Sequence, residues 1–236
     1  MTVRGAALTA TGSEALCLEG RNAVHLADCQ VSGSMPDLPQ NDNTWTVIVY
    51  QSMSGDSEVG KGTFEMIGGS LRSTNGGLFY TTNTESEFVL AGVDIDAPGA
   101  DYFLRCTGNA NQRGWGKSGQ NGAKCVFTGI GQEMTGDVLW DSISELTLNV
   151  CEGSVLDGAV TQDERFAGEG GDGWAHVTID ADSAWVVTGD SRVTALRCDG
   201  QLVDEAGVPV RVVGTDGTVY VDGESSVTVT VDTYGE

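Results

Sequence analysis

Short segments of alternating apolar and polar residues recur along this chain at a nearly constant spacing. Phe64 and Phe88 hold matching places in two such segments. A second series repeats at a larger offset, in which Leu146 matches Val177. Gly, Asn and Asp turns separate the segments, and a single segment buries only one of its sides. Units of this kind must therefore stack as the coils of a solenoid.

The repeat predicts an all-β fold, a parallel β-solenoid in which each strand hydrogen-bonds to the coils above and below at about 4.8 Å. Residues 1–236 are expected to form one domain of about ten coils. Loop excursions are expected near 106–125 and 161–175, because the larger second offset requires an insertion in one turn. The alternative is an antiparallel β-sandwich, whose turns come about every 8–12 residues. Matches in the same phase at the offset from Phe64 to Phe88 favour the coils.

The charge of the chain limits its partners. It has 34 acidic and 12 basic residues, which gives a net charge of −22. Such a field repels phosphate backbones and anionic lipid surfaces, so we expect neither nucleic-acid binding nor docking to a membrane. No apolar run approaches the length that spans a bilayer, so membrane insertion is not expected. A hydrophobic content of 39% excludes a disordered acidic tail.

Six stretches of the sequence carry a resemblance to a known group of proteins. They resemble the right-handed parallel β-helix repeat proteins of gut bacteria, which are adhesin-like, and they comprise 50–60, 66–71, 113–122, 134–138, 141–146 and 183–191. The resemblance implies a single-stranded, right-handed, pectin-lyase-like superhelix and export from the cell. It brings no catalytic residues with it. Because the chain starts in strand-like sequence without an apolar leader, it is expected to be a mature or trimmed part of an exported protein.

Cys106 and Cys125 bracket a polar loop that coincides with the first expected excursion. A disulfide between them would staple this loop. The alternative is that both are small buried side chains that face the core. Six cysteines are few for a chain of 236 residues, so disulfides are not expected to be its main framework.

The same loop is the best candidate for binding, because it concentrates Arg113, Trp115 and Lys117 in an otherwise acidic chain. Tryptophan stacks on the faces of sugar rings, and Arg or Lys can hold the carboxylates of acidic glycans. Long loops on a rigid scaffold are common places for function. The alternative is that Trp115 covers one end of the core.

Two carboxylates are candidates for catalysis. Asp94 and Asp96 alternate with apolar residues, so both are expected to point outward from one strand, about 7 Å apart. That spacing suits the acid pair of a glycoside hydrolase. A polysaccharide lyase would also need a basic group, for which Arg105 and Lys124 are the candidates. The alternative is a solvated acidic face without catalytic function.

The second expected excursion is rich in acid and glycine, and its acidic residues are Asp163, Glu164, Glu169 and Asp172. Their oxygens could bind Ca²⁺, the cation that prefers such ligands. The loop has neither the order of an EF-hand nor the calcium-binding nonapeptide repeat. We therefore expect no cofactor, with Ca²⁺ at this loop as the alternative.

Together these features predict a non-catalytic extracellular or cell-surface protein, an adhesin-like scaffold for binding or presentation. Its expected partner is a glycan or a host or bacterial surface protein. The first alternative is a carbohydrate-active enzyme, either a polysaccharide lyase or a glycoside hydrolase, that uses the outward carboxylates. The second alternative is a structural spacer within a larger surface protein.

Overall fold

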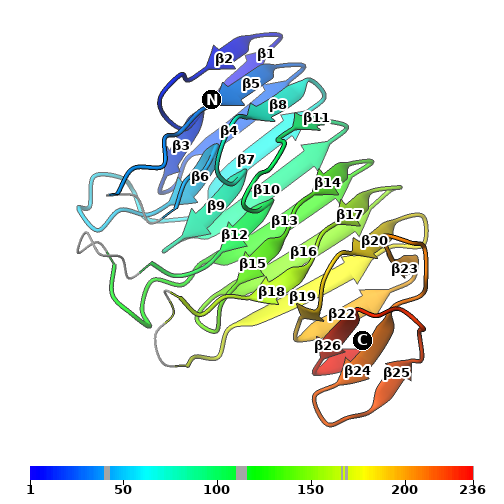
Figure 1. Cartoon of the computed structure of the whole chain (residues 1–236). Helices are drawn as coiled ribbons and strands as arrows, with labels where there is room; N and C mark the ends of the chain where they lie inside the picture. Colours follow the sequence, from blue (N-terminus) through cyan, green and yellow to red (C-terminus); the bar gives the residue numbers. More distant parts are fainter. Residues whose placement is uncertain (40–42, 110–115, 166, 168–169, 236) are drawn as a thin grey trace.

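The computed structural model describes residues 1–39, 43–109, 116–165, 167 and 170–235. All regular structure in these residues is β-strand, and the strands stack as coils into an elongated body (Figure 1). This part of the chain therefore holds no helix with the length and apolar character that crossing a membrane requires. The predicted all-β parallel solenoid is confirmed.

Two sheets run along most of the body, and all their strands are parallel. The long sheet has nine strands, in the order β1 (Thr2–Arg4), β4 (Ala23–Ala27), β7 (Gly62–Ile67), β10 (Glu85–Ala91), β13 (Lys124–Ile130), β16 (Glu145–Cys151), β19 (Trp174–Ile179), β22 (Ala195–Cys198) and β27 (Thr233–Tyr234). The other is called the third sheet, because its strands come third in each coil. It has six strands, β3 (Leu16–Glu19), β6 (Val47–Tyr50), β9 (Phe79–Thr82), β12 (Leu104–Cys106), β15 (Val138–Trp140) and β18 (Val160–Gln162).

The face between these two is divided into two sheets of four strands. Its N-terminal sheet contains β2 (Ala7–Thr9), β5 (Gln30–Gly33), β8 (Ser70–Ser73) and β11 (Asp94–Asp96). Its C-terminal sheet contains β14 (Glu133–Thr135), β17 (Val155–Asp157), β20 (Ala184–Val187) and β23 (Gln201–Asp204). Three consecutive strands, one from each face, therefore make one coil.

The register confirms the first repeat and corrects the second. Phe64 pairs with Phe88 across β7 and β10, as the first series predicts. In the second series Val177 pairs with Leu148 and not with Leu146, so the predicted offset is wrong by two residues. A slip of two leaves every side chain on its own side of the sheet, which is why the pattern did not reveal it. The nine strands of the long sheet compare with the ten or so coils expected.

The C-terminal end departs from the simple coil pattern. There the strands β21 (Ser191–Arg192), β26 (Thr228–Val231), β24 (Arg211–Gly214) and β25 (Val219–Val221) form one small sheet. β24 and β25 make an antiparallel hairpin, whereas β26 returns to lie parallel to both β21 and β24. The last part of the chain therefore folds back on itself at the C-terminal end of the stack of coils.

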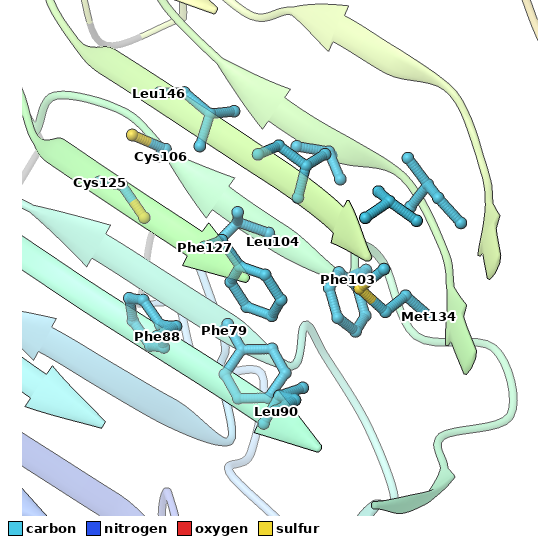
Figure 2. Packing of buried hydrophobic residues seen from close by; sticks show 14 of the residues in the cluster. Phe79, Phe88, Leu90, Phe103, Leu104, Cys106, Cys125, Phe127, Met134 and Leu146 are labelled. Carbon is cyan, nitrogen blue, oxygen red and sulfur yellow. The ribbon is translucent and has the colours of Figure 1, made fainter. Parts of the chain in front are cut away.

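Inward side chains from all faces form one continuous apolar core. At its centre five phenylalanine rings contact one another, with ring centroids 5.2–6.1 Å apart, and Figure 2 shows most of them from close by. These rings are Phe64, Phe79, Phe88, Phe103 and Phe127, and all are fully buried. Aromatic pairs at such distances contribute beyond the burial of their area.

Tight corners between strands depend on glycine at particular places. Gly69, in the turn from β7 to β8, has φ +79°, and a Cβ there would overlap the backbone of Cys29 in the previous coil. We expect Gly69→Ala to lower the free energy of unfolding by about 2 kcal/mol, from the left-handed backbone and the overlap together. Gly5→Ala is the control, because Gly5 has φ +60° but open space around it, and about 1 kcal/mol is expected. Equal losses in chemical denaturation would contradict this account of the corner.

Both predicted loop excursions are present. The first joins the end of β12 at Cys106 to β13, and the second joins the end of β18 at Gln162 to β19. Two further long connections, 34–46 and 51–61, were not expected. All four begin or end at a strand of the third sheet, and Figure 1 shows them on the side of the body where this sheet lies.

Candidate functional site

The outer surface of the third sheet is buried over its middle strands β6, β9 and β12, although a solenoid face usually meets solvent. Ile48, Tyr80, Arg105 and Leu139 are paired in register on β6, β9, β12 and β15. Their neighbours along each strand point into the core, so these four point outward. Even so, Ile48 is 5% exposed, Tyr80 1% and Arg105 0%. The long connections must therefore cover this surface and form a second packed layer outside the solenoid.

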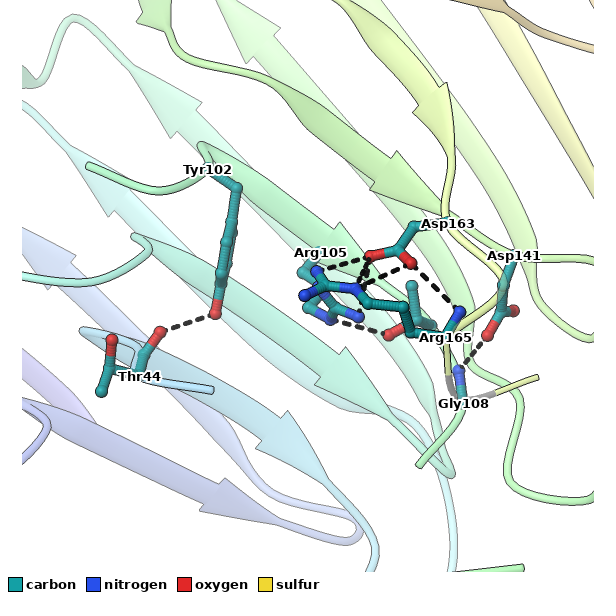
Figure 3. A network of polar contacts seen from close by, with 8 residues as sticks. Thr44, Tyr102, Arg105, Gly108, Asp141, Asp163 and Arg165 are labelled. Atoms are coloured by element: carbon teal, nitrogen blue, oxygen red, sulfur yellow. Dashed lines mark hydrogen bonds and ion pairs between the residues drawn. The ribbon is translucent and has the colours of Figure 1, made fainter. Parts of the chain in front are cut away.

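Arg105 lies at the centre of this layer and is held by an ion pair. Its Nη2 lies 3.1 Å from Oδ2 of Asp163, which is itself mostly buried. Its Nε donates to Oγ1 of Thr107 at 3.1 Å. Asp163 also accepts hydrogen bonds from Arg165, from its backbone N–H at 3.1 Å, from Nε at 3.0 Å and from Nη2 at 2.7 Å, so one carboxylate bridges two guanidinium groups (Figure 3).

The charges of this network match its contacts. Burial pushes the pKa of Asp163 upward, but the hydrogen bonds from Arg165 and the charge of Arg105 outweigh it and hold that pKa below its ordinary value. The same pairing raises the pKa of Arg165. Asp163 is therefore ionised at neutral pH, as the ion pair requires. The stability that it contributes is present above the ordinary aspartate pKa and is lost as the pH falls through the lowered value.

Two further contacts fasten the covering segments. Asp141 accepts a hydrogen bond from the backbone N–H of Gly108 at 2.6 Å, and burial raises the pKa of this carboxyl. The Tyr102 hydroxyl donates to the carbonyl oxygen of Thr44 at 2.7 Å, and burial raises the pKa of Tyr102, so it remains a donor (Figure 3). Segments that are far apart in the chain are thereby held in one fixed arrangement.

A hollow of about 310 Å³ lies beside Arg105, at the mouth of this layer. Apart from Leu139, its lining residues carry guanidinium, carboxylate, amide and hydroxyl groups, and they are Asp37, Asn43, Thr44, Asp101, Tyr102, Arg105 and Arg165. The volume is at the lower end of the range for small-molecule sites. Such a set of donors and acceptors suits a small ligand that carries several hydroxyl groups.

Sequence reasoning missed most of this hollow. It named Arg105 as a possible base for a lyase, whereas the structure makes Arg105 part of the floor of a polar pocket. Apart from Leu139 of β15, the other lining residues come from connections that lie far apart in the sequence. One signal was present, because Arg105 occupies an outward position beside a long loop, where a charged side chain becomes buried if that loop folds back.

The predicted binding residues of the first loop are mostly outside the described part of the chain. Arg113 and Trp115 fall in the segment that the structure leaves undescribed, so their contribution stays a prediction. Lys117 is exposed, and its carbonyl oxygen accepts hydrogen bonds from the backbone N–H of Gln120 and from Nδ2 of Asn121. The end of this loop is therefore an ordered turn.

The predicted disulfide is not formed in this structure. Cys106 and Cys125 are free, buried thiols that point into the core from β12 and β13 (Figure 2). Burial and the contact with Cys125 raise the pKa of Cys106 well above its ordinary value. The alternative of two small core side chains describes them better, because the ladders of β12 and β13 already hold the ends of the loop.

The predicted catalytic residues are only partly brought together. Asp94 and Asp96 are both exposed on β11, as expected, and they line a hollow of about 540 Å³ with Glu133 of β14. Arg105 lies on the third sheet, in a different hollow, where Asp163 neutralises it. The structure therefore does not bring Arg105 to the two acids, and a catalytic role for Asp94 and Asp96 stays a prediction. The cation beside the acids is Arg72, 3.7 Å from Asp96.

Of the four acidic residues proposed for Ca²⁺, the three that the structure describes do not form a metal site. Asp163 is committed to two arginines, and Glu164 accepts hydrogen bonds from the backbone N–H and the hydroxyl of Ser142 at 3.0 and 2.8 Å. Asp172 is exposed, and Glu169 lies outside the described residues. Within the described ranges, no group of three or more His, Cys, Asp or Glu is arranged to hold a metal ion.

The chain was also compared with known proteins. No protein-family model, no curated protein and no solved structure matches it. The fold and the two hollows described above are therefore the basis for its function.

Proposed function

We propose that this protein is a non-catalytic binding scaffold, extracellular or on the cell surface, and that the hollow beside Arg105 takes a sugar residue. The observation that carries this proposal is the fully buried Arg105 at a polar hollow under the covering segments. Burial of a guanidinium is costly unless its partners compensate for the lost water. A pocket whose polar groups are already fixed by such partners is preorganised for a ligand.

The chemistry of the lining supports a sugar as the ligand. Carboxylates such as Asp37 and Asp101 accept hydrogen bonds from hydroxyl groups, and the guanidinium of Arg165 donates them. The net charge of −22 disfavours the approach of polyanions, so a sugar with few or no charges fits better than a highly charged polysaccharide. The resemblance to adhesin-like β-helix proteins of gut bacteria supports the surface location and a glycan or a surface protein as partner.

A glycan array that compares the wild type with three variants tests this proposal. We expect Arg165→Gln to lower binding at least tenfold while the melting temperature stays nearly unchanged, because 65% of this side chain is exposed. Arg197→Gln is the matched control, since Arg197 pairs with Asp199, also two residues away, but lies on the long sheet. Trp115→Ala, with and without Ca²⁺, separates the hollow from the loop site predicted from sequence.

Each outcome of the array bears on the proposal. Equal losses in Arg165→Gln and Arg197→Gln would contradict a specific role for the hollow. Loss in Trp115→Ala alone would place the glycan on the loop and overturn the assignment to the hollow. A wild-type protein that binds no glycan would leave the structural spacer as the better description.

The enzyme alternative has one observation in its favour, namely that Asp94 and Asp96 border a hollow with Glu133. A hydrolase would release reducing ends from a polysaccharide, and Asp94→Asn would abolish that release. We expect no release from the wild type, as the non-catalytic scaffold proposed above requires.

A further inference from the structure

The face between the long sheet and the third sheet is interrupted between β11 and β14. On the long sheet β10 pairs with β13 over seven residues, so the two coils are stacked there. On the next face of the same two coils, the N-terminal sheet ends at β11 and the C-terminal sheet begins at β14, with no ladder between these two strands. The hollow of about 540 Å³ lies at this interruption.

The residues at the interruption explain why the ladder stops. Continuing the register of β10 and β13 would place Asp94 directly opposite Glu133. Like charges directly opposite each other destabilise strand pairing. At the first step of the missing ladder, the side-chain amide of Gln132 replaces a backbone partner. Its Oε1 accepts a hydrogen bond from the backbone N–H of Val93 at 2.8 Å. Its Nε2 donates to the carbonyl oxygens of Val93 at 2.8 Å and Glu133 at 2.7 Å.

The side-chain amide of Gln132 therefore takes the place, in this opening, of the peptide group of an additional strand. It is 1% exposed, and it gives and receives the hydrogen bonds of one ladder step. Beyond it the two strand edges continue without a ladder along the hollow. The buried amide shows that the opening accepts a peptide-like group with both hydrogen-bonding directions satisfied.

The backbone of β11 presents hydrogen-bonding groups to the hollow. The N–H of Asp94 donates backwards to Gly69 of the previous coil at 2.9 Å. Because successive residues of a strand direct their backbone groups to alternate neighbours, the N–H and C=O of Ile95 face the hollow. On the other side the carbonyl of Gln132 accepts from the N–H of Val155 at 2.9 Å, so the N–H of Glu133 faces the hollow.

We propose that this interruption is a docking site for an extended basic peptide segment of a partner protein, which adds a strand along the edge of β11. Charge selects this occupant, because the hollow is lined by three carboxylates, those of Asp94, Asp96 and Glu133. A second copy of this chain carries a net charge of −22 and would be repelled. Addition of a strand to an exposed edge gives affinity through main-chain hydrogen bonds, and side-chain pockets give specificity.

Apolar groups complete the surface. Ile95, Ala97 and Pro98 line the hollow beside the carboxylates. An extended segment that alternates basic and apolar side chains would therefore place its basic side chains over the acids and its apolar side chains against this patch. This site is separate from the sugar site, so either proposal can fail without the other.

The test uses fluorescence anisotropy of the full chain with a labelled peptide that alternates Lys and Val over seven residues, in about 0.15 M salt to screen nonspecific attraction. We expect Asp94→Asn with Glu133→Gln to weaken binding at least tenfold. Glu205→Gln with Glu224→Gln is the control, because it removes the same charge at exposed positions outside the hollow. The unmodified peptide is further compared with two versions that are N-methylated at every second residue, one in each phase.

Methylation distinguishes strand docking from attraction by charge alone. If a strand adds to β11, one methylation phase removes the donors that face the edge and weakens binding at least tenfold, whereas the other has a smaller effect. Equal binding of all three peptides would overturn the proposal, and so would equal losses in the two double variants. Failure of the unmodified peptide to bind at about millimolar concentration would also overturn it.

Discussion

Arg105→Met is expected to lower the free energy of unfolding by about 3 kcal/mol, because it leaves the mostly buried carboxylate of Asp163 without its inner partner. Methionine fills a similar volume, so the loss reports the missing charge and the missing hydrogen bond to Thr107. Removal of one member of a buried pair is costly, whereas exposed pairs contribute little. Denaturation in guanidinium chloride, followed by tryptophan fluorescence, measures the change.

Two companion variants separate this pair from the surface charges around it. Arg165→Met removes the exposed partner of the same carboxylate and should cost less than about 1 kcal/mol. Replacement of the whole pair, Arg105→Met with Asp163→Leu, should cost less than Arg105→Met alone, because no buried charge is left unpaired. If the double variant instead loses as much as Arg105→Met and Asp163→Leu measured separately and added together, the two side chains are not coupled.

The general architecture could be predicted from sequence because it follows from local alternation. The pairing of Phe64 with Phe88 needs only a repeat that stays in phase, and the turns that separate the strands are rich in glycine. The same alternation could not distinguish Leu146 from Leu148 as the partner of Val177, since both point inward. Nor did it reveal the antiparallel hairpin at the C-terminal end, which the chain forms only after the last full coil.

The candidate site was less predictable, because it depends on contacts between distant segments. A charged residue at an outward strand position ordinarily meets solvent, and Arg105 is buried because residues of neighbouring connections, Thr44 and Asp163 among them, lie beside it. Tyr102 contributes through a hydrogen bond to Thr44, 58 residues earlier in the chain. The loop near 106–125 was correctly predicted as an excursion, whereas the hollow beside Arg105 could not be derived from composition.

The interruption between β11 and β14 could not be predicted from the sequence either, although the orientation of two of its residues could. The outward positions of Asp94 and Asp96 were predicted correctly from alternation. Whether these carboxylates interrupt strand pairing depends on Glu133. It comes into register with Asp94 only when the intervening loop lies outside the stack of coils. A repeat whose units carry insertions therefore conceals cross-strand charge pairs until its register is known.

Phe79→Ala is expected to lower the free energy of unfolding by about 4 kcal/mol, because it opens a cavity at the centre of the aromatic cluster. Phe79 contacts four other rings, more than any other member, with centroids 5.4–5.9 Å away. Ile67→Ala is the control, since Ile67 lies on β7 but is 49% exposed, and it should cost less than about 1 kcal/mol. Similar losses in the two variants would mean that stacking of the coils, and not this cluster, dominates stability.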